Sequence, residues 1–175
     1  MRKLFLHFAI TLDGMFPTWS SGSRLPMRRC ETEGFTTRHL MPSFLATTTM
    51  HRWQPIGRTR KGRRHQQKYV LSHNDVALVW RNSALLRAAD STAFKGAIAQ
   101  LKAMPGKDIT VDSGEGTWRS FLEHDLWDGL DMLVHPLVIG QGKPLLTALP
   151  TEASLRLVAG KTYDNGVVNL RYEKG

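Results

Sequence analysis

Residues 15–67 interrupt an otherwise regularly patterned sequence of 175 residues. They show no sustained apolar period of 2 or 3.6, so their pattern predicts neither strands nor helices. Residues 15–68 also hold eleven of the 24 lysines and arginines, against only two acidic residues, Glu31 and Glu33. Because the formal net charge is +9, the rest of the chain is neutral. The sequence therefore predicts a single neutral domain, 1–175, that contains one basic, aperiodic segment at 15–67.

Composition excludes several classes of protein. The single cysteine, Cys30, can form neither an internal disulfide nor a thiolate zinc site, which excludes a secreted disulfide scaffold. No apolar run approaches the roughly 18 residues that cross a bilayer, since the run 130–139 is interrupted by Asp131, His135 and Pro136. The opening residues lack the features of a signal peptide. We therefore expect a cytoplasmic protein with no membrane partner.

Apolar patterns outside the segment predict strands that alternate with helices. Strands are expected at 2–12, 69–72, 84–86, 108–112, 130–138, 154–159 and 166–172, and helices at 92–103 and 117–124. Ser91 is the expected N-cap of the first helix. The expected core side chains of the two helices are Phe94, Ile98, Leu101, Trp118, Phe121 and Leu122. This order predicts an α/β fold whose sheet ends in antiparallel strands.

A glycine-containing turn at 113–116 joins a predicted strand to a predicted helix. The N-terminus of a helix presents unpaired N–H groups and a partial positive charge, which suit a phosphate. Many such turns contain glycine for steric reasons alone, and this one is not a dinucleotide-binding fingerprint. Glu115 would oppose a bound phosphate if its carboxylate pointed inwards. The residues alone therefore leave two interpretations open: a phosphate-binding turn, or a turn whose glycines are there for steric reasons only.

Three further polar residues lie in or next to apolar strands. Asp13 precedes Gly14 and is typical of a turn, although a carboxylate at the end of a strand can also border a ligand crevice. His7 and His135 are expected to be core histidines bonded to backbone carbonyls. The sequence has no set of histidines and cysteines at metal-ligand spacing, so we expect no metal site.

The chain resembles the dihydrofolate-reductase-like family, typified by the C-terminal reductase domain of the bacterial riboflavin-biosynthesis deaminase/reductase. The opening RKLFLHFAITLDG at 2–14 resembles the family's first strand and its Thr-Leu-Asp-Gly turn. About 121 residues in two blocks are similar. The other similar stretches are KYVLS at 68–72, GKDITVDSG at 106–114, RSFLEH at 119–124, HPLVIGQGKP at 135–144 and GVVNLRY at 166–172.

The resemblance implies a mixed, mostly parallel sheet flanked by helices, and an NADPH-dependent reductase of a pterin or aminopyrimidine. It places Ala9 against the nicotinamide and makes Asp13 the candidate catalytic carboxylate beside the substrate. It also implies that backbone amides of the turn bind the cofactor phosphates, at Ser113, Gly114, Glu115, Gly116 and Thr117. Members of the family often pair through sheet edges, so the resemblance further implies a homodimer.

Two departures from the family pattern point to alternatives. Ser113 replaces the first glycine of the paired-glycine turn, and the Leu-Gly-Arg-x-Thr-Tyr strand expected within 15–67 is absent. The segment is then either a genuine insert or a frameshifted region, and the protein could be a catalytically impaired family member. Within the segment, only 44–50 has a composition that suits a replacement strand. A second alternative is nucleic-acid binding through the arginine-rich residues 24–64, near Trp19, Phe35 and Trp53.

Overall fold

The computed structural model describes residues 1–16, 43–47, 67–78, 81–144, 146–150 and 152–175. The nine expected strands and helices are all present, with ends shifted by no more than three residues. The elements are β1 (Leu4–Thr11), β2 (Met15–Phe16), β3 (Ser43–Thr47), β4 (Gln67–Ser72), β5 (Ser83–Arg87), α1 (Ser91–Ala103), β6 (Ile109–Asp112), α2 (Glu115–Glu123), β7 (Gly129–His135), β8 (Lys143–Pro144), a 3-10 turn (Leu146–Ala148), β9 (Leu155–Thr162) and β10 (Val168–Lys174).

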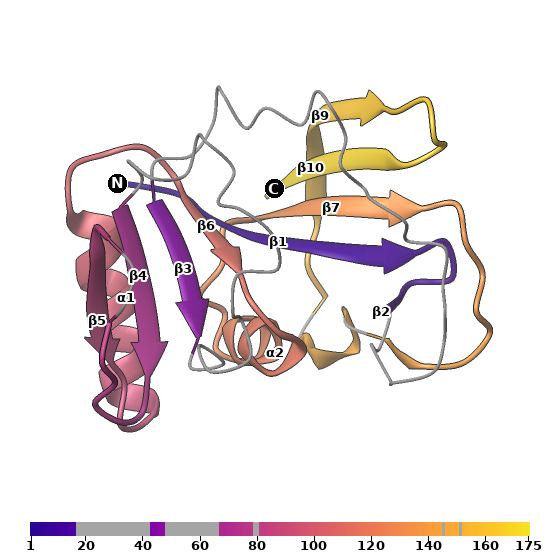
Figure 1. Cartoon of the computed structure of the whole chain (residues 1–175). Helices are drawn as coiled ribbons and strands as arrows, with labels where there is room; N and C mark the ends of the chain where they lie inside the picture. The colour runs from indigo at the N-terminus through magenta and orange to yellow at the C-terminus, as the bar shows by residue number, and fades with distance from the viewer. Residues whose placement is uncertain (17–42, 48–66, 79–80, 145, 151) are drawn as a thin grey trace.

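Eight of the strands form one sheet in the order β5-β4-β3-β6-β1-β7-β10-β9 (Figure 1). The strands from β5 to β7 are parallel, and β10 pairs antiparallel with both β7 and β9. β2 and β8 form a separate two-stranded pair. The structure therefore confirms the expected fold class, a mostly parallel sheet with antiparallel C-terminal strands.

β3 comes from the aperiodic basic segment and lies in the middle of the sheet. It pairs in parallel with β4 on one side and with β6 on the other. Its residues, 43–47, overlap the one stretch, 44–50, that the sequence offered as a replacement strand. Without β3, the edges of β4 and β6 would both be unpaired, which favours aggregation. The remainder of the segment lies outside the described residues, apart from β2 and Gln67.

Both helices pack against one face of the sheet (Figure 1). Side chains alternate between the faces of a strand, and on β1 the even-numbered residues from Leu4 to Ile10 point towards the helices. The six helix side chains expected in the core are all buried with them, each at most 6% exposed. Ser91 is not the N-cap of α1. Asp90 occupies that position, and its carboxylate accepts a hydrogen bond from Ala93 N.

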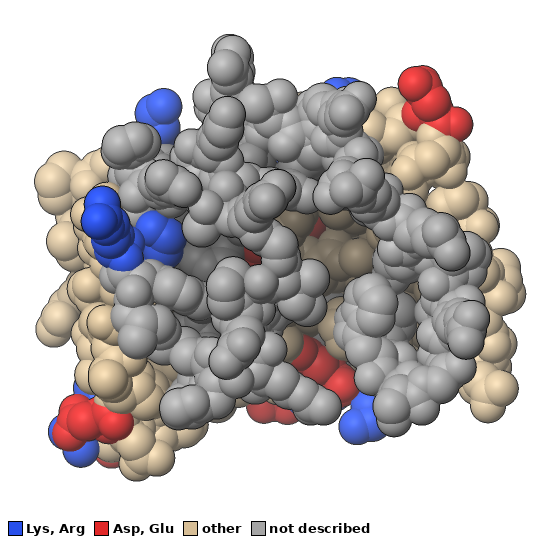
Figure 2. All heavy atoms as spheres, viewed as in Figure 1, with Lys and Arg blue, Asp and Glu red and all other residues tan. Residues whose placement is uncertain are grey.

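The described residues carry almost no net charge, with 14 lysines and arginines against 13 aspartates and glutamates. On the face drawn in Figure 2, the charged side chains in view lie apart from one another and form no patch. The arginines that suggested nucleic-acid binding, residues 24–64, lie outside the described residues. No helix in the described part of the chain is long and apolar enough to cross a membrane.

Candidate functional site

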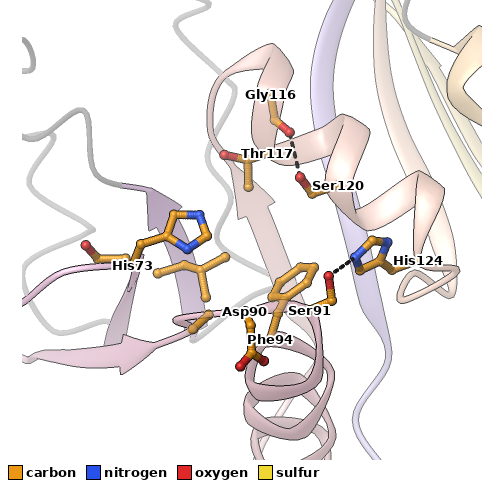
Figure 3. Close-up of a pocket in the computed structure, with 11 residues that line it drawn as sticks. His73, Asp90, Ser91, Phe94, Gly116, Thr117, Ser120 and His124 are labelled. Atoms are coloured by element: carbon orange, nitrogen blue, oxygen red, sulfur yellow. Dashed lines mark hydrogen bonds between the residues drawn. The ribbon is translucent and has the colours of Figure 1, made fainter.

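A pocket of about 600 Å³ opens where the end of β4 meets the first turns of α1 and α2. Figure 3 shows Asp90 and Ser91 reaching it from the start of α1, and Gly116 and Thr117 from the start of α2. Open α/β sheets bind ligands at the carboxyl ends of their strands, and this pocket lies at the carboxyl end of β4. The fold therefore brings two helix N-termini to one ligand-sized cavity.

The two helix N-termini make this pocket suitable for an anion. Each helix leaves its first N–H groups unpaired and carries a partial positive charge at that end. Among the described lining residues the only carboxylate is Asp90, and it is engaged as the cap of α1. Phosphate groups are among the anions that helix N-termini bind in this way.

The local geometry of the turn before α2 settles the orientation of Glu115. Its carboxylate forms an ion pair with Arg119, at 3.1 Å, one turn along the helix. It is not among the residues that line the pocket. Arg119 thus holds the Glu115 carboxylate against α2 and partly neutralises the charge that could have repelled a phosphate.

Hydrogen bonds hold the turn in a fixed conformation. Ser113 Oγ donates to Thr117 Oγ1 at 3.0 Å. The carbonyl of Gly114, the N-cap, accepts hydrogen bonds from Thr117 N and Trp118 N. The amides of Glu115 and Gly116 precede these bonds, and helix geometry leaves such amides without an intrahelical partner. A Cβ added to Gly116 would meet no atom within 4 Å, so space is open beside its backbone.

The structure separates the predicted cofactor residues into two places. Gly116 and Thr117 line the pocket, and Ser113 to Glu115 form the turn beside it. Ala9 lies on β1, in register with Leu133 of β7. Its register with β6 has already ended, because Asp112, the last residue of β6, is opposite His7. Among the described strands, the carboxyl half of β1 is therefore paired on the β7 side only.

Asp13 connects the end of β1 to the loop after β7. Its carboxylate accepts hydrogen bonds from Thr11 Oγ1 and from the backbone amides of Ile139 and Gly140, at 3.2 and 2.8 Å to the amides. The Thr11 hydroxyl, then the Gly140 amide, hold the pKa of Asp13 below its usual range. At neutral pH the group is therefore ionised, so it can accept hydrogen bonds from a ligand but has no proton to donate.

We expect Asp13→Asn to remove an acid-sensitive part of the stability. A carboxyl whose folded-state pKa is lowered stabilises the fold above its unfolded value, about 3.9, and that contribution is lost as the pH falls through the folded pKa. Urea denaturation of wild type and variant is expected to differ at pH 7 and to converge in strong acid. Asp164→Asn, in an exposed Asp-Asn-Gly turn, is the control. Equal unfolding of wild type and Asp13→Asn at pH 7 would contradict the assigned contacts.

Two histidines that line the pocket were not among the predicted site residues. His73 lines the pocket from the end of β4, and His124 Nε2 lies 3.2 Å from Ser91 Oγ, which links α2 to α1 (Figure 3). No local pattern joins His124 to a residue 33 positions away. His7 Nδ1 lies 3.3 Å from Asp131 Oδ2, a contact between two strands that the sequence did not predict.

This sheet order, with a pocket at the start of α2, defines the dihydrofolate-reductase-like class of fold. Dihydrofolate reductase from Enterococcus faecalis, solved with NADP(H), superimposes with a TM-score of 0.64 at 11% identity, covering 99% of this chain and 96% of that one. The putative riboflavin biosynthesis protein from Shewanella sp. PV-4 also gives 0.64, at 15% identity and 99% coverage of both chains. At such identities the likeness shows the fold alone.

Sequence comparison identifies the family. The profile of the RibD C-terminal domain matches residues 2–169, across the aperiodic segment, and the chain belongs to this family. The uncharacterized protein YyaP of Bacillus subtilis strain 168 is 35% identical over 111 residues, which are 61% of this chain and 54% of YyaP. The chain thus spans about half the length of that curated relative.

Proposed function

We propose that the protein is an NADPH-dependent reductase that transfers a hydride to a pterin or aminopyrimidine of the riboflavin or folate type. Membership of the RibD C-terminal domain family supports a reductase of this pathway. Among the structural neighbours is the diaminohydroxyphosphoribosylaminopyrimidine deaminase/5-amino-6-(5-phosphoribosylamino)uracil reductase of Thermotoga maritima, with a TM-score of 0.59 at 14% identity, of which this chain covers 57%. The E. faecalis reductase was solved with NADP(H).

The observation that carries this proposal is the convergence of two helix N-termini on one pocket. A dinucleotide has several phosphate groups, and the N-terminus of α2 offers backbone amides to them. At the N-terminus of α1 the Ala93 amide is already bonded to Asp90, so α2 is the main phosphate-binding end. In this arrangement the amides of the 113–117 turn would hold the pyrophosphate, and Ala9 on β1 would lie against the nicotinamide. The bound cofactor supplies the hydride.

Residues of this chain would bind the phosphate and orient the substrate. The open space beside Gly116 lets a phosphate approach the backbone. Asp13, fixed by three hydrogen bonds, is suited to orient a substrate by accepting a hydrogen bond, because its carboxylate is ionised. We therefore assign Asp13 an orienting role and no proton donation.

We expect Gly116→Asp to weaken NADPH binding at least about tenfold without unfolding the protein. The new carboxylate would repel a phosphate at the helix N-terminus, while the same charge in the first turn favours the helix itself. Gly96→Asp is the matched control, because Gly96 is an exposed glycine of α1 whose Cβ position is also open. Calorimetry and melting temperature with NADPH, and with NADH for comparison, measure the effect.

The wild-type protein decides between the reductase and the impaired family member. Oxidation of NADPH in the presence of 5-amino-6-(5-phosphoribosylamino)uracil or dihydrofolate supports the reductase. Binding of NADPH without oxidation by either compound supports an impaired member. No rise in melting temperature at millimolar NADPH would rule out the proposed cofactor site, since a ligand that binds only the folded state must stabilise it.

A further inference from the structure

A row of four charged or titratable side chains crosses the centre of the sheet. Asp112 on β6, His7 on β1, Asp131 on β7 and Arg171 on β10 are in register on strands that lie side by side (Figure 1). Residues in register project from the same face of a sheet. Since the even-numbered residues of β1 face the helices, this row lies on the opposite face.

His7 and Asp131 form the centre of the row. His7 Nδ1 lies 3.3 Å from Asp131 Oδ2, and the Asn169 amide donates to Asp131 Oδ1 at 2.7 Å. The two side chains keep 17% and 13% of their surface exposed, whereas Leu6 and Phe8 on the helix-facing side of β1 are at most 2% exposed. A buried ion pair often stabilises a fold no more than apolar residues of similar volume would, so stability alone does not account for this pair.

An ionised carboxylate lies beside His7 in the row. Burial alone would raise the pKa of Asp131, but the hydrogen bond and charge of His7, the Asn169 amide and the charge of Arg171 together hold it below its usual range. The carboxylate is therefore ionised, and an ionised partner favours the imidazolium form of a histidine. Among the described elements packed against it, His7 faces Asp112 on β6 and Asp131 on β7, with Arg171 beyond Asp131.

The row lies close to Ala9, where the nicotinamide that supplies the hydride is proposed to bind. His7 and Ala9 are two residues apart on one strand, so they share a face and their Cα atoms lie about 6.6 Å apart. If Ala9 contacts the nicotinamide, as proposed above, a substrate stacked on that ring on this face is within reach of the His7 side chain. The inference therefore rests on the proposed function.

We propose that His7 is the general acid of the reduction and that Asp131 is a positioning residue that orients its imidazole. The substrate class is a nitrogen heterocycle with a reducible C=N bond, or a glycosylamine whose sugar ring opens to give an imine with such a bond. The carbon of that bond receives the hydride from the cofactor, the π electrons move to the nitrogen, and the nitrogen takes a proton from the His7 imidazolium. The products are the amine and the oxidised cofactor, and solvent then reprotonates His7.

The kinetic test compares pH profiles of kcat/KM for NADPH oxidation with 5-amino-6-(5-phosphoribosylamino)uracil or dihydrofolate. For His7→Gln we expect a loss of about 100-fold or more, with the fall in rate at high pH abolished and NADPH affinity unchanged. For Asp131→Asn we expect the fall in kcat/KM at high pH to begin at a lower pH than in wild type. Unchanged rates and profile in an active His7→Gln variant would overturn the proposal while leaving the proposed function intact.

His135 provides the matched control. It lies on β7 in register with Thr11, and burial lowers its pKa, so it is neutral at pH 7 and is not suited to donate a proton. His135→Gln is expected to keep the fall in rate at high pH. If His135→Gln abolishes that fall and His7→Gln does not, the general acid has been assigned to the wrong histidine.

Imidazole NMR of the free protein tests the same assignment without catalysis. We expect the His7 ring to carry both protons at neutral pH, and to lose one at a lower pH in Asp131→Asn than in wild type. A neutral His7 ring at pH 7, or a titration that Asp131→Asn does not move, overturns the proposal even if the protein proves inactive. Failure of the wild-type protein to bind NADPH would instead reject the proposed function.

Discussion

Replacing Leu45 by proline is expected to destabilise the fold by about 3 kcal/mol or more and to leave much of the protein aggregated. Leu45 lies in β3, in register with Tyr69 of β4 and Val111 of β6. Whichever neighbour its N–H faces, a strand is present to accept the hydrogen bond. Proline removes that donor, and it is found almost exclusively on edge strands and at bulges.

Leu45→Ala keeps the backbone donor and is the control for the proline variant. Both variants lose the leucine side chain. The difference between their free energies of unfolding in urea therefore measures the contribution of the backbone hydrogen bond in the sheet. Equal stability of the two variants would show that β3 is not a central strand. In that case residues 43–47 would be part of an insert that the sheet does not need.

This experiment bears on the origin of the aperiodic segment. The sequence predicted the strands outside it from their apolar runs, and it identified 44–50 as a replacement strand from threonines and apolar residues alone. It could not predict that this strand lies between β4 and β6, because the order of parallel strands depends on contacts far apart in the chain. Translating the coding DNA in the other two frames still tests the frameshift hypothesis, which fails if neither frame encodes a glycine-arginine-threonine-tyrosine strand.

The candidate site was predictable only where its residues are contiguous. The 113–117 turn was found because strand, glycine and helix follow one another, and Gly116 and Thr117 do line the pocket. The orientation of Glu115 depends on Arg119, one helical turn away, and followed from no pattern that the sequence analysis used. His124 and the His7–Asp131 pair join residues from separate elements, so their contacts exist only once the sheet and helices have packed.

Gly129 was missed for a related reason. A glycine before an apolar strand is typical of a turn, and nothing in the local sequence distinguishes one that packing requires. In the structure it is the first residue of β7, between β1 and β10. A Cβ built there would lie 2.3 Å from the carbonyl oxygen of Tyr172 and 2.5 Å from Cε1 of Phe5. Real Cβ atoms do not approach other atoms so closely, so the absence of a side chain is structural.

We expect Gly129→Ala to cost about 3 kcal/mol of stability, measured as a lower midpoint of urea denaturation. The carbonyl of Tyr172 belongs to β10, which is paired along β7, and Phe5 is fully buried beneath the Arg171 guanidinium, 3.7 Å from its ring centre. Neither group can move without separating strands or disturbing the core. The added methyl group therefore strains the junction of β1, β7 and β10.

Gly160→Ala is the matched control for this substitution. Gly160 is also a strand glycine, on β9, but a Cβ there meets only Leu170 Cδ2, at 3.8 Å, which is ordinary van der Waals contact. We expect that variant to be at least as stable as wild type, by up to about 1 kcal/mol, because alanine restricts the unfolded chain and no strain offsets this. If Gly129→Ala unfolds at the same urea concentration as Gly160→Ala, then β1, β7 and β10 are not packed as closely as their register indicates, and the row through His7 and Asp131, which depends on that register, loses its basis.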